Sequence, residues 1–365
     1  MLYLKKLTKE FSGLKTIILC IILLNLISIG SLYSSLHQQG QFVGGDILNK
    51  QFAWIVLSWL VFIIFNFINY RLYYNLAFPI YALSVILIGA VYLTGYEAMG
   101  AQRWLSIGGL TFQPSELSKI AIIIIMARFL SHLPANNFLK DFCIPFSFVG
   151  ISALMIVKQP DLGTAIVIGL IAFAMGLFSK INKKYFIWVL ALMLIAAPFS
   201  WNLLKSYQQK RLTVFINPNV DPLGSGYTII QSKIAIGSGQ IFGKGFLAGT
   251  QNQFNFLPER HTDFIFTVIA EEWGFLGSFF ILFIYWLILR KIFDKLKKIR
   301  DPFAYYLTLG IGIYFFLHIF INIGMTLGIF PVVGLPLIFV SYGGSHLISS
   351  FILLGIFFNI SRNYK

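Results

Sequence analysis

Residues 303–327 read FAYYLTLGIGIYFFLHIFINIGMTL, an apolar run that contains no Asp, Glu, Lys or Arg. A helix needs about 20 mostly apolar residues to cross the hydrocarbon core of a bilayer, with a range of about 17–25. This run has the length and the composition for such a helix. It therefore predicts a membrane-spanning helix near the end of the chain.

The composition of the whole chain agrees with that prediction. Of the 365 residues, 58% are hydrophobic and 11% are charged, whereas soluble domains are about 45–50% apolar and about 25% charged. A water-soluble fold of this size cannot bury so many apolar side chains in its core. The composition therefore indicates that much of the chain lies in a lipid bilayer. The two cysteines, Cys20 and Cys143, give neither a disulfide framework nor a metal signature.

Nine further apolar runs predict the other membrane spans. With the first run they give an all-α polytopic membrane protein of about ten transmembrane helices, at 17–36, 52–69, 76–95, 117–133, 142–157, 163–180, 185–204, 264–290, 303–327 and 337–360. No small-x-small cleavage site stands out after the first run, which favours a retained helix over a signal peptide. We expect residues 1–365 to form a single transmembrane domain.

The basic residues set the expected orientation. Most of the 28 Lys and Arg residues fall in segments that are cytoplasmic if the N-terminus is cytoplasmic, as the positive-inside rule requires. We therefore expect a multi-pass protein of the inner (plasma) membrane with both termini in the cytoplasm. The net charge of +15 then reflects topology, and no nucleic-acid partner is expected.

Two outer segments are longer or richer in glycine than a simple connection requires. Residues 96–116 form a predicted loop with glycines at 100, 108 and 109. Residues 205–263, between the seventh and eighth spans, form a long extracytoplasmic loop. Apolar residues spaced along this loop predict partial helices at the membrane surface.

The segment NFLPERHTDFIF, residues 255–266, gathers ionisable side chains at the start of the eighth span. In one interpretation Thr262 is the N-cap and Asp263 complements the helix dipole in the first turn. In the other, Asp263 is a catalytic base in a dehydrated mouth, where its pKa can be tuned. Glu271 and Glu272 follow about two turns later and must face the protein interior or a wet cavity.

Four blocks of sequence resemble the SEDS (shape, elongation, division and sporulation) family of glycosyltransferases. They are TQNQFNFLPERHTDFIF at 250–266, AQRWLSIGGLTFQPSELSK at 101–119, KQPDLGTA at 158–165 and FPVVGLPLIFVSYGGS at 330–345. The RHTDFIF form is closer to the RodA branch of the family than to the FtsW branch. In this family the aspartate of the HTDF block is regarded as catalytic, which implies that role for Asp263.

The resemblance implies a peptidoglycan glycosyltransferase that polymerises lipid II during cell elongation and so controls cell shape. A lipid-linked glycan is the donor and lipid II is the acceptor. The acceptor hydroxyl attacks the anomeric carbon, undecaprenyl pyrophosphate leaves, and a β-1,4 bond forms with inversion. The sequence leaves open whether a divalent cation, Mg²⁺ or Mn²⁺, takes part.

Eight further residues are predicted to bind the substrate or its pyrophosphate. Trp104 could stack on a sugar face while Arg103 contacts a phosphate. Alternatively, Trp104 lies at the membrane interface beside a snorkelling Arg103. Glu116 and Lys119, at i and i+3, share a helix face and lie where ionisable groups suggest function. Asp161 could instead cap the sixth span.

The remaining three lie in the long loop. Lys244 sits in GSGQIFGKGFLAG, which could form a backbone nest for a lipid pyrophosphate. Arg211 and Gln231 belong to family-like stretches, RLTVFINP and YTIIQSKIAIGSG.

Two other functions stay open at this stage. A lipid II flippase would place charged groups along a central path, and a scaffold of a cell-wall complex would not need Asp263. The resemblance also implies two kinds of partner, a class B penicillin-binding protein that supplies transpeptidation and membrane proteins of the elongation complex.

Overall fold

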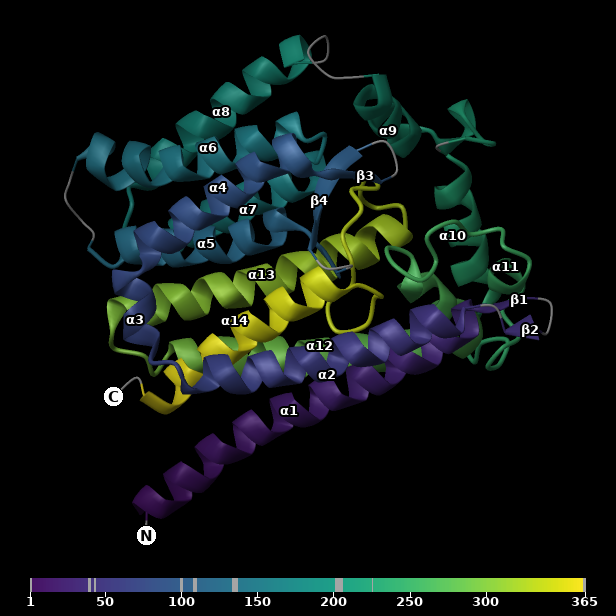
Figure 1. Ribbon diagram of the computed structural model, residues 1–365, viewed down its shortest axis with the longest axis horizontal. Coiled ribbons are helices and arrows are strands. Elements are labelled where there is room, and N and C mark those ends of the chain that lie inside the picture. The colour runs from purple at the N-terminus through teal and green to yellow at the C-terminus, as the bar shows by residue number, and fades with distance from the viewer. Residues whose placement is uncertain are drawn as a thin grey trace. The chain divides into compact units, whose positions relative to one another are not determined.

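The computed structural model describes residues 2–38, 41–42, 44–98, 101–107, 110–132, 137–200, 206–224 and 226–363. The described chain is mostly helical (Figure 1). Its longer helices are α1 Leu2–Ser35, α2 Gly45–Phe67, α4 Ala77–Thr94, α5 Pro114–Leu130, α6 Ile144–Lys158, α7 Leu162–Leu177, α8 Lys183–Ser200, α9 Ser206–Ile216, α10 Tyr227–Ser238, α12 Ile265–Leu296, α13 Pro302–Thr326 and α14 Gly344–Asn363.

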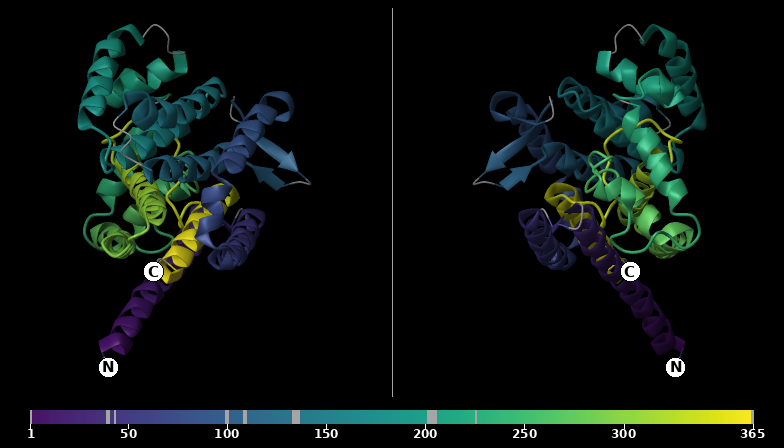
Figure 2. Two further views of the ribbon diagram at one scale, coloured as in Figure 1. Left: turned by 90° about the vertical axis from the view of Figure 1, so that its left-hand side faces the viewer. Right: turned by 90° about the vertical axis from the view of Figure 1, so that its right-hand side faces the viewer.

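The shorter elements connect these helices. They are α3 Tyr70–Asn75, the π-helical turn η1 Leu139–Cys143, the 3₁₀ turn η3 Pro218–Val220, α11 Thr250–Gln253, and the strands β1 His37–Gln38, β2 Gln41–Phe42, β3 Tyr96–Ala98, β4 Ala101–Ile107 and β5 Leu110–Phe112. The antiparallel order β3-β4-β5 replaces much of the loop predicted at 96–116 (Figure 2). The glycines at 100, 108 and 109 and residues 201–205 and 225 lie outside the described residues.

Six of the described helices are long and apolar enough to cross a membrane. They include residues 13–35, 45–67, 139–158, 265–296, 302–326 and 344–363. Two shorter apolar helices, Ala77–Leu93 and Leu162–Leu177, coincide with further predicted spans. The chain is therefore a multi-pass membrane protein, whereas the number of ten spans stays a prediction.

The last predicted span starts later than expected. The sequence predicts helix from residue 337, but α14 begins at Gly344 and residues 331–337 have no regular structure. Pro331 and Pro336 lack the N–H that a helix needs, and Gly334 adopts a φ of +73°. The FPVVGLPLIFVSYGGS block is thus an ordered, largely non-helical segment before α14.

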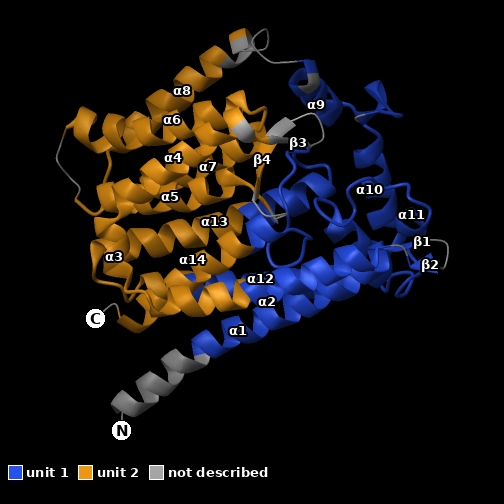
Figure 3. Cartoon of the chain, viewed as in Figure 1, with its two compact units in different colours: residues 1–57, 204–292, 318–347 blue, residues 58–203, 293–317, 348–365 orange. Residues whose placement is uncertain are grey.

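The chain divides into two compact units, each built from separate stretches of sequence (Figure 3). Unit 1 comprises residues 1–57, 204–292 and 318–347, and unit 2 comprises residues 58–203, 293–317 and 348–365.

In unit 2, α5 is the most enclosed helix. It packs against α4, α6 and α7, and most of its residues are buried, including Ser115, Glu116, Ser118 and Lys119. A helix that is apolar all round belongs in the interior of a bundle. The polar side chains at the start of α5 are therefore held inside the unit.

In unit 1, α1 runs antiparallel to α12. Ser34 donates a hydrogen bond to Glu272 near one end of the pair, and Gly13 lies against Lys291 near the other. Both Glu271 and Glu272 are buried, at 1% and 2% exposure. The prediction that these two carboxylates face the protein interior is confirmed.

Candidate active site

Asp263 lies in a tight turn just before α12, not inside the helix. The helix begins at Ile265, and its first turn holds no acidic residue. The Thr262 hydroxyl donates to the Glu259 carbonyl at 3.2 Å and contacts the Glu259 carboxylate at 3.1 Å. The interpretation of Thr262 as N-cap and Asp263 as a first-turn acid is therefore wrong, because the turn that begins at Glu259 binds the threonine and delays the helix.

Three consecutive carbonyl groups at this turn are held from the C-terminal part of unit 1. The Tyr342 amide donates to the His261 carbonyl at 2.9 Å, and the Ser341 hydroxyl donates to the Thr262 carbonyl at 2.5 Å. The Asn322 side chain donates to the Asp263 carbonyl at 2.9 Å. The backbone that carries Asp263 is thereby fixed on residues about 60–80 positions later.

Asn322 is a residue whose part in the site the sequence does not reveal. It lies fully buried on α13, and its amide group also donates to the Leu335 carbonyl at 2.6 Å. It thus joins the Asp263 turn to the non-helical segment before α14. The sequence shows only an isolated polar residue on an apolar helix, for which packing is the usual role.

A glycine keeps space beside the Asp263 carboxylate. A Cβ atom built on Gly334 would lie 3.4 Å from Asp263 Oδ2, and the φ of +73° at this position disfavours other residues. The carboxylate and the non-helical segment are therefore in close contact.

The side chains before Asp263 are partly desolvated. Arg260 is buried and its Nε donates to the Ser35 carbonyl at 2.7 Å, and burial lowers the pKa of its guanidinium. Burial also lowers the pKa of the His261 imidazole, with Arg260 adding to the shift and Glu259 opposing it. The residues just before Asp263 thus lie in surroundings that disfavour the charged forms of their side chains.

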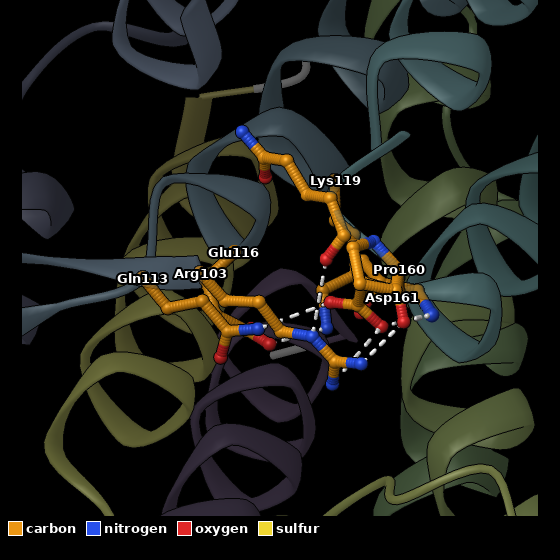
Figure 4. A network of polar contacts seen from close by, with 8 residues as sticks. Arg103, Gln113, Glu116, Lys119, Pro160 and Asp161 are labelled. Carbon is orange, nitrogen blue, oxygen red and sulfur yellow. Dashed lines mark hydrogen bonds and ion pairs between the residues drawn. The ribbon is translucent and has the colours of Figure 1, made fainter. Parts of the chain in front are cut away.

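In unit 2, Arg103 and Asp161 meet where β4 approaches the start of α7 (Figure 4). Arg103 Nη1 is 3.9 Å from Asp161 Oδ1, and the same guanidinium donates to the Pro160 carbonyl and, at 3.4 Å, to the Gln159 carbonyl. Gln113 donates to Asp161 Oδ2 at 3.2 Å. The predicted residues Arg103 and Asp161 therefore belong to one cluster.

Asp161 also has the structural role that the sequence left open. Its side chain accepts from the Thr164 amide at 3.2 Å and caps the N-terminus of α7. Trp104, next to Arg103, is half-buried on β4, where it pairs with Tyr96.

Glu116 and Lys119 form a buried ion pair on α5. Lys119 Nζ is 2.7 Å from Glu116 Oε1, and the two side chains are 0% and 4% exposed. The prediction that they share a helix face is confirmed. Lys119 Nζ also lies 5.6 Å from the centre of the Tyr314 ring. Because Lys119 is enclosed, any contact with a pyrophosphate requires this region to open.

The loop residues predicted to bind pyrophosphate have different surroundings. Lys244 Nζ is 2.7 Å from Glu271 Oε1, and the amides of Lys244 and Gly245 donate to the Glu271 and Glu272 carbonyls at 3.0 and 2.9 Å. These amides are not available for the expected phosphate nest, because α12 is interrupted beside them. Arg211 is exposed on α9, and Gln231 is half-buried on α10.

Within the described residues, no group of three or more His, Cys, Asp or Glu side chains could enclose a divalent cation. A dedicated protein cage therefore does not fit this part of the chain. Magnesium bound by one or two carboxylates together with substrate phosphates would need no such cage.

Comparison with known proteins places this arrangement in a family. Residues 13–365 match the profile of the cell cycle protein family FtsW/RodA/SpoVE. The chain belongs to this family. Among its relatives, the peptidoglycan glycosyltransferase MrdB of Escherichia coli K12 is 39% identical over 329 residues, which cover 89% of this chain and 88% of that protein.

Solved structures of other proteins share this fold. One chain of a peptidoglycan synthase complex that coordinates polymerisation and crosslinking matches with a TM-score of 0.82 and 27% identity, over 95% of this chain and 97% of that one. The rod shape determining protein RodA of Thermus thermophilus matches with a TM-score of 0.71 and 25% identity, over 95% and 96%. The resemblance to the RodA branch of SEDS proteins is thus confirmed.

Proposed function

We propose that this family member is a peptidoglycan glycosyltransferase that polymerises lipid II into glycan strands during cell elongation. Relatives that carry this activity in their names support the reaction class. The observation that supports the site is Asp263, a carboxylate on a turn whose three carbonyls are fixed by Asn322, Ser341 and Tyr342. A base must be held in place to act in a transition state.

In the proposed reaction, the GlcNAc 4-hydroxyl of lipid II attacks the MurNAc anomeric carbon of the lipid-linked glycan. The C–O bond to the α-linked pyrophosphate breaks, undecaprenyl pyrophosphate leaves, and a β-1,4 bond forms with inversion. Asp263 accepts the hydroxyl proton, a role worth about 10²–10⁴-fold in rate. Cationic side chains stabilise the leaving group, and Arg103, Arg211 and Lys244 are the more accessible of those predicted.

The buried pair of Glu116 and Lys119 has a different part in this proposal. Because both side chains are buried, we propose that the pair first stabilises α5 within unit 2. Contact with the substrate stays a prediction for these two residues. Trp104 stays the predicted contact for a sugar face, and Gln231 stays a predicted contact for the lipid pyrophosphate. Magnesium or manganese, if used, would bind with the substrate phosphates.

The surroundings of the enzyme form part of the same proposal. We infer ten spans, both termini in the cytoplasm, a location in the inner membrane, and residues 205–263 outside, all within one functional domain. A class B penicillin-binding protein is the proposed partner, because the neighbouring structure from a synthase complex couples polymerisation to crosslinking. The other proposed partners are membrane proteins of the elongation complex.

One assay separates the proposed polymerase from a lipid II flippase and from a non-catalytic scaffold. The purified chain, with and without its transpeptidase partner, is incubated with lipid II in detergent, and the products are separated on a gel. Polymerisation yields a ladder of glycan strands that a muramidase digests. Lipid II that stays unpolymerised in both samples, while the partner alone remains active in crosslinking, would contradict the proposal.

A further inference from the structure

A cavity of about 380 Å³ in unit 2 is lined by none of the residues predicted for the active site. Its size falls in the range of small-molecule sites, about 300–1,000 Å³. The lining side chains come from the α3 region, the end of α5 and the start of α13, and they are Arg71, Tyr74, Asn75, Ser131, His132, Asp301, Pro302 and Phe303.

The cavity lies beside the ends of candidate membrane-spanning helices. The candidate spans α2 and α12 end at Phe67 and Leu296, and α13 begins at Pro302. Around these helix ends, apolar side chains remain uncovered: Leu72 is 46% exposed and Leu76 is 38% exposed. Exposed leucines at the ends of candidate spans suit the boundary between acyl chains and lipid headgroups.

Basic residues outnumber acidic ones on the cavity lining and in the chain just before it. Arg71 is exposed on α3, and Lys297, Lys298 and Arg300 are exposed just before Asp301. Lys297 lies 3.7 Å from the Asp294 carboxylate. The one acidic lining residue is already engaged: Asp301 Oδ2 accepts from the Tyr70 hydroxyl at 2.8 Å, and Oδ1 accepts from the Phe303 amide at 3.0 Å. Asp301 is thus the single negative charge on the cavity wall, and it interacts with the Arg71 cation.

The walls of the cavity are held in fixed positions. The Tyr74 hydroxyl and His132 Nε2 are 2.9 Å apart, and His132 Nδ1 is 3.1 Å from the Arg128 carbonyl. The Arg128 guanidinium donates to the Tyr74 carbonyl at 2.5 Å and stacks 4.6 Å from the Tyr74 ring centre. These contacts tie the α3 region to the end of α5, so the Arg71 side chain borders a preformed space.

We propose that this cavity binds the phosphodiester headgroup of an anionic membrane lipid. The Arg71 guanidinium presents forked N–H donors that match phosphate oxygens, and the Asn75 amide lies on the same wall. Leu72 and Leu76 would contact the part of the acyl chains that lies next to the headgroup. Basic cavities between membrane helices are a known way to hold such headgroups. This proposal does not rest on the proposed glycosyltransferase reaction.

The test measures lipid binding to the full-length protein in detergent by native mass spectrometry. Phosphatidylglycerol is titrated against the parental protein, with phosphatidylcholine as the zwitterionic comparison. We expect Arg71→Ala to weaken phosphatidylglycerol binding about five- to tenfold. We expect Asp301→Asn to strengthen phosphatidylglycerol binding about two- to fivefold, because a negative charge is removed while the side-chain oxygen that accepts from the Phe303 amide at the start of α13 is kept. Lys184→Ala, which removes an exposed cation on α8, is the matched control and should change nothing.

Two results would overturn the proposal. One is phosphatidylglycerol binding that Arg71→Ala leaves at the parental level while melting temperatures match. The other is displacement of phosphatidylglycerol by inorganic phosphate or glycerol phosphate at equal concentration, which would assign the cavity to a soluble anion. A variant that melts early is replaced by Arg71→Gln, which keeps the size of the side chain but not its charge.

Discussion

Asp263 takes its position from polar groups that lie far from it in the sequence. The carbonyls of residues 261–263 precede α12 and accept bonds from Tyr342, Ser341 and Asn322. Because each of these donors is in the same unit, the turn and the C-terminal block form one polar assembly. Removing any one of these three donors can therefore displace the Asp263 carboxylate, even though only Asp263 would contact the substrate.

Asn322→Ala is expected to impair catalysis more than stability explains. The change leaves the part-buried Asp263 carbonyl and the buried Leu335 carbonyl without this donor, which costs about 1–3 kcal/mol, and it frees the backbone at Asp263. We expect kcat to fall about tenfold or more with KM little changed, as a misplaced base requires. Asn25→Ala, which removes a buried amide that donates to the Ile21 carbonyl at 3.1 Å, is the control. Equal losses of kcat in both variants would make Asn322 merely structural.

Lys119 is expected to behave as one half of a buried pair. Lys119→Ala strands the Glu116 carboxylate in the interior, which typically costs about 3–5 kcal/mol. The double change Glu116→Gln with Lys119→Met removes both charges and should recover most of that stability, as measured by thermal unfolding in detergent. If Lys119→Ala melts like the parental protein, the pair is not enclosed as described.

At the scale of elements, α12 is interrupted at Gly274, and the loop after α10 forms hydrogen bonds to the backbone that follows the break. Gly274 adopts φ +63° and ψ −157° inside the helix, a conformation open almost only to glycine. The loop after α10 supplies the missing partners: Phe275 and Leu276 donate to the Gln240 and Ile241 carbonyls at 2.8 and 3.1 Å. The buried carboxylates Glu271 and Glu272 lie directly before the break.

Gly274→Ala should destabilise the protein. A Cβ at this position would approach the Gly243 amide nitrogen to 2.3 Å, so both the helix and the bridging loop must shift, and we expect a loss of about 1–3 kcal/mol. Gly150→Ala on α6 is the control, because its Cβ would meet nothing within 4 Å, and it should be neutral or slightly stabilising. Melting curves of the two variants that coincide would contradict this account of the break.

How much the sequence predicts depends on whether the partners are local. The Glu116–Lys119 pair and the cap at Asp161 follow from spacing along one helix, and the spans follow from apolar runs. The bond between Asn322 and the Asp263 turn joins residues 59 positions apart, and the break at Gly274 depends on residues 240–241. No periodicity in the sequence carries such information, so these features appear only in the folded chain.

At the scale of the whole molecule, the proposed orientation can be tested with single cysteines. Asn219→Cys places an exposed thiol on η3, within 205–263, and Lys184→Cys places one at the start of α8. In a background with Cys20 and Cys143 replaced by serine, an impermeant maleimide should label the first in intact spheroplasts and the second only after lysis. The positive-inside rule is the reason for this expectation. The reverse pattern would invert the topology.

The proposed reaction depends most directly on Asp263, so the deciding measurement is the lipid II polymerisation rate of Asp263→Asn beside its melting curve. Asparagine keeps the size of the side chain, so stability should change by no more than about 1 kcal/mol. It cannot accept the hydroxyl proton, so the rate should fall about 10²–10⁴-fold. Asp294→Asn, a matched change at an exposed position of α12, should keep the parental rate. An Asp263→Asn protein that makes glycan at the parental rate would contradict the assignment of Asp263 as the base.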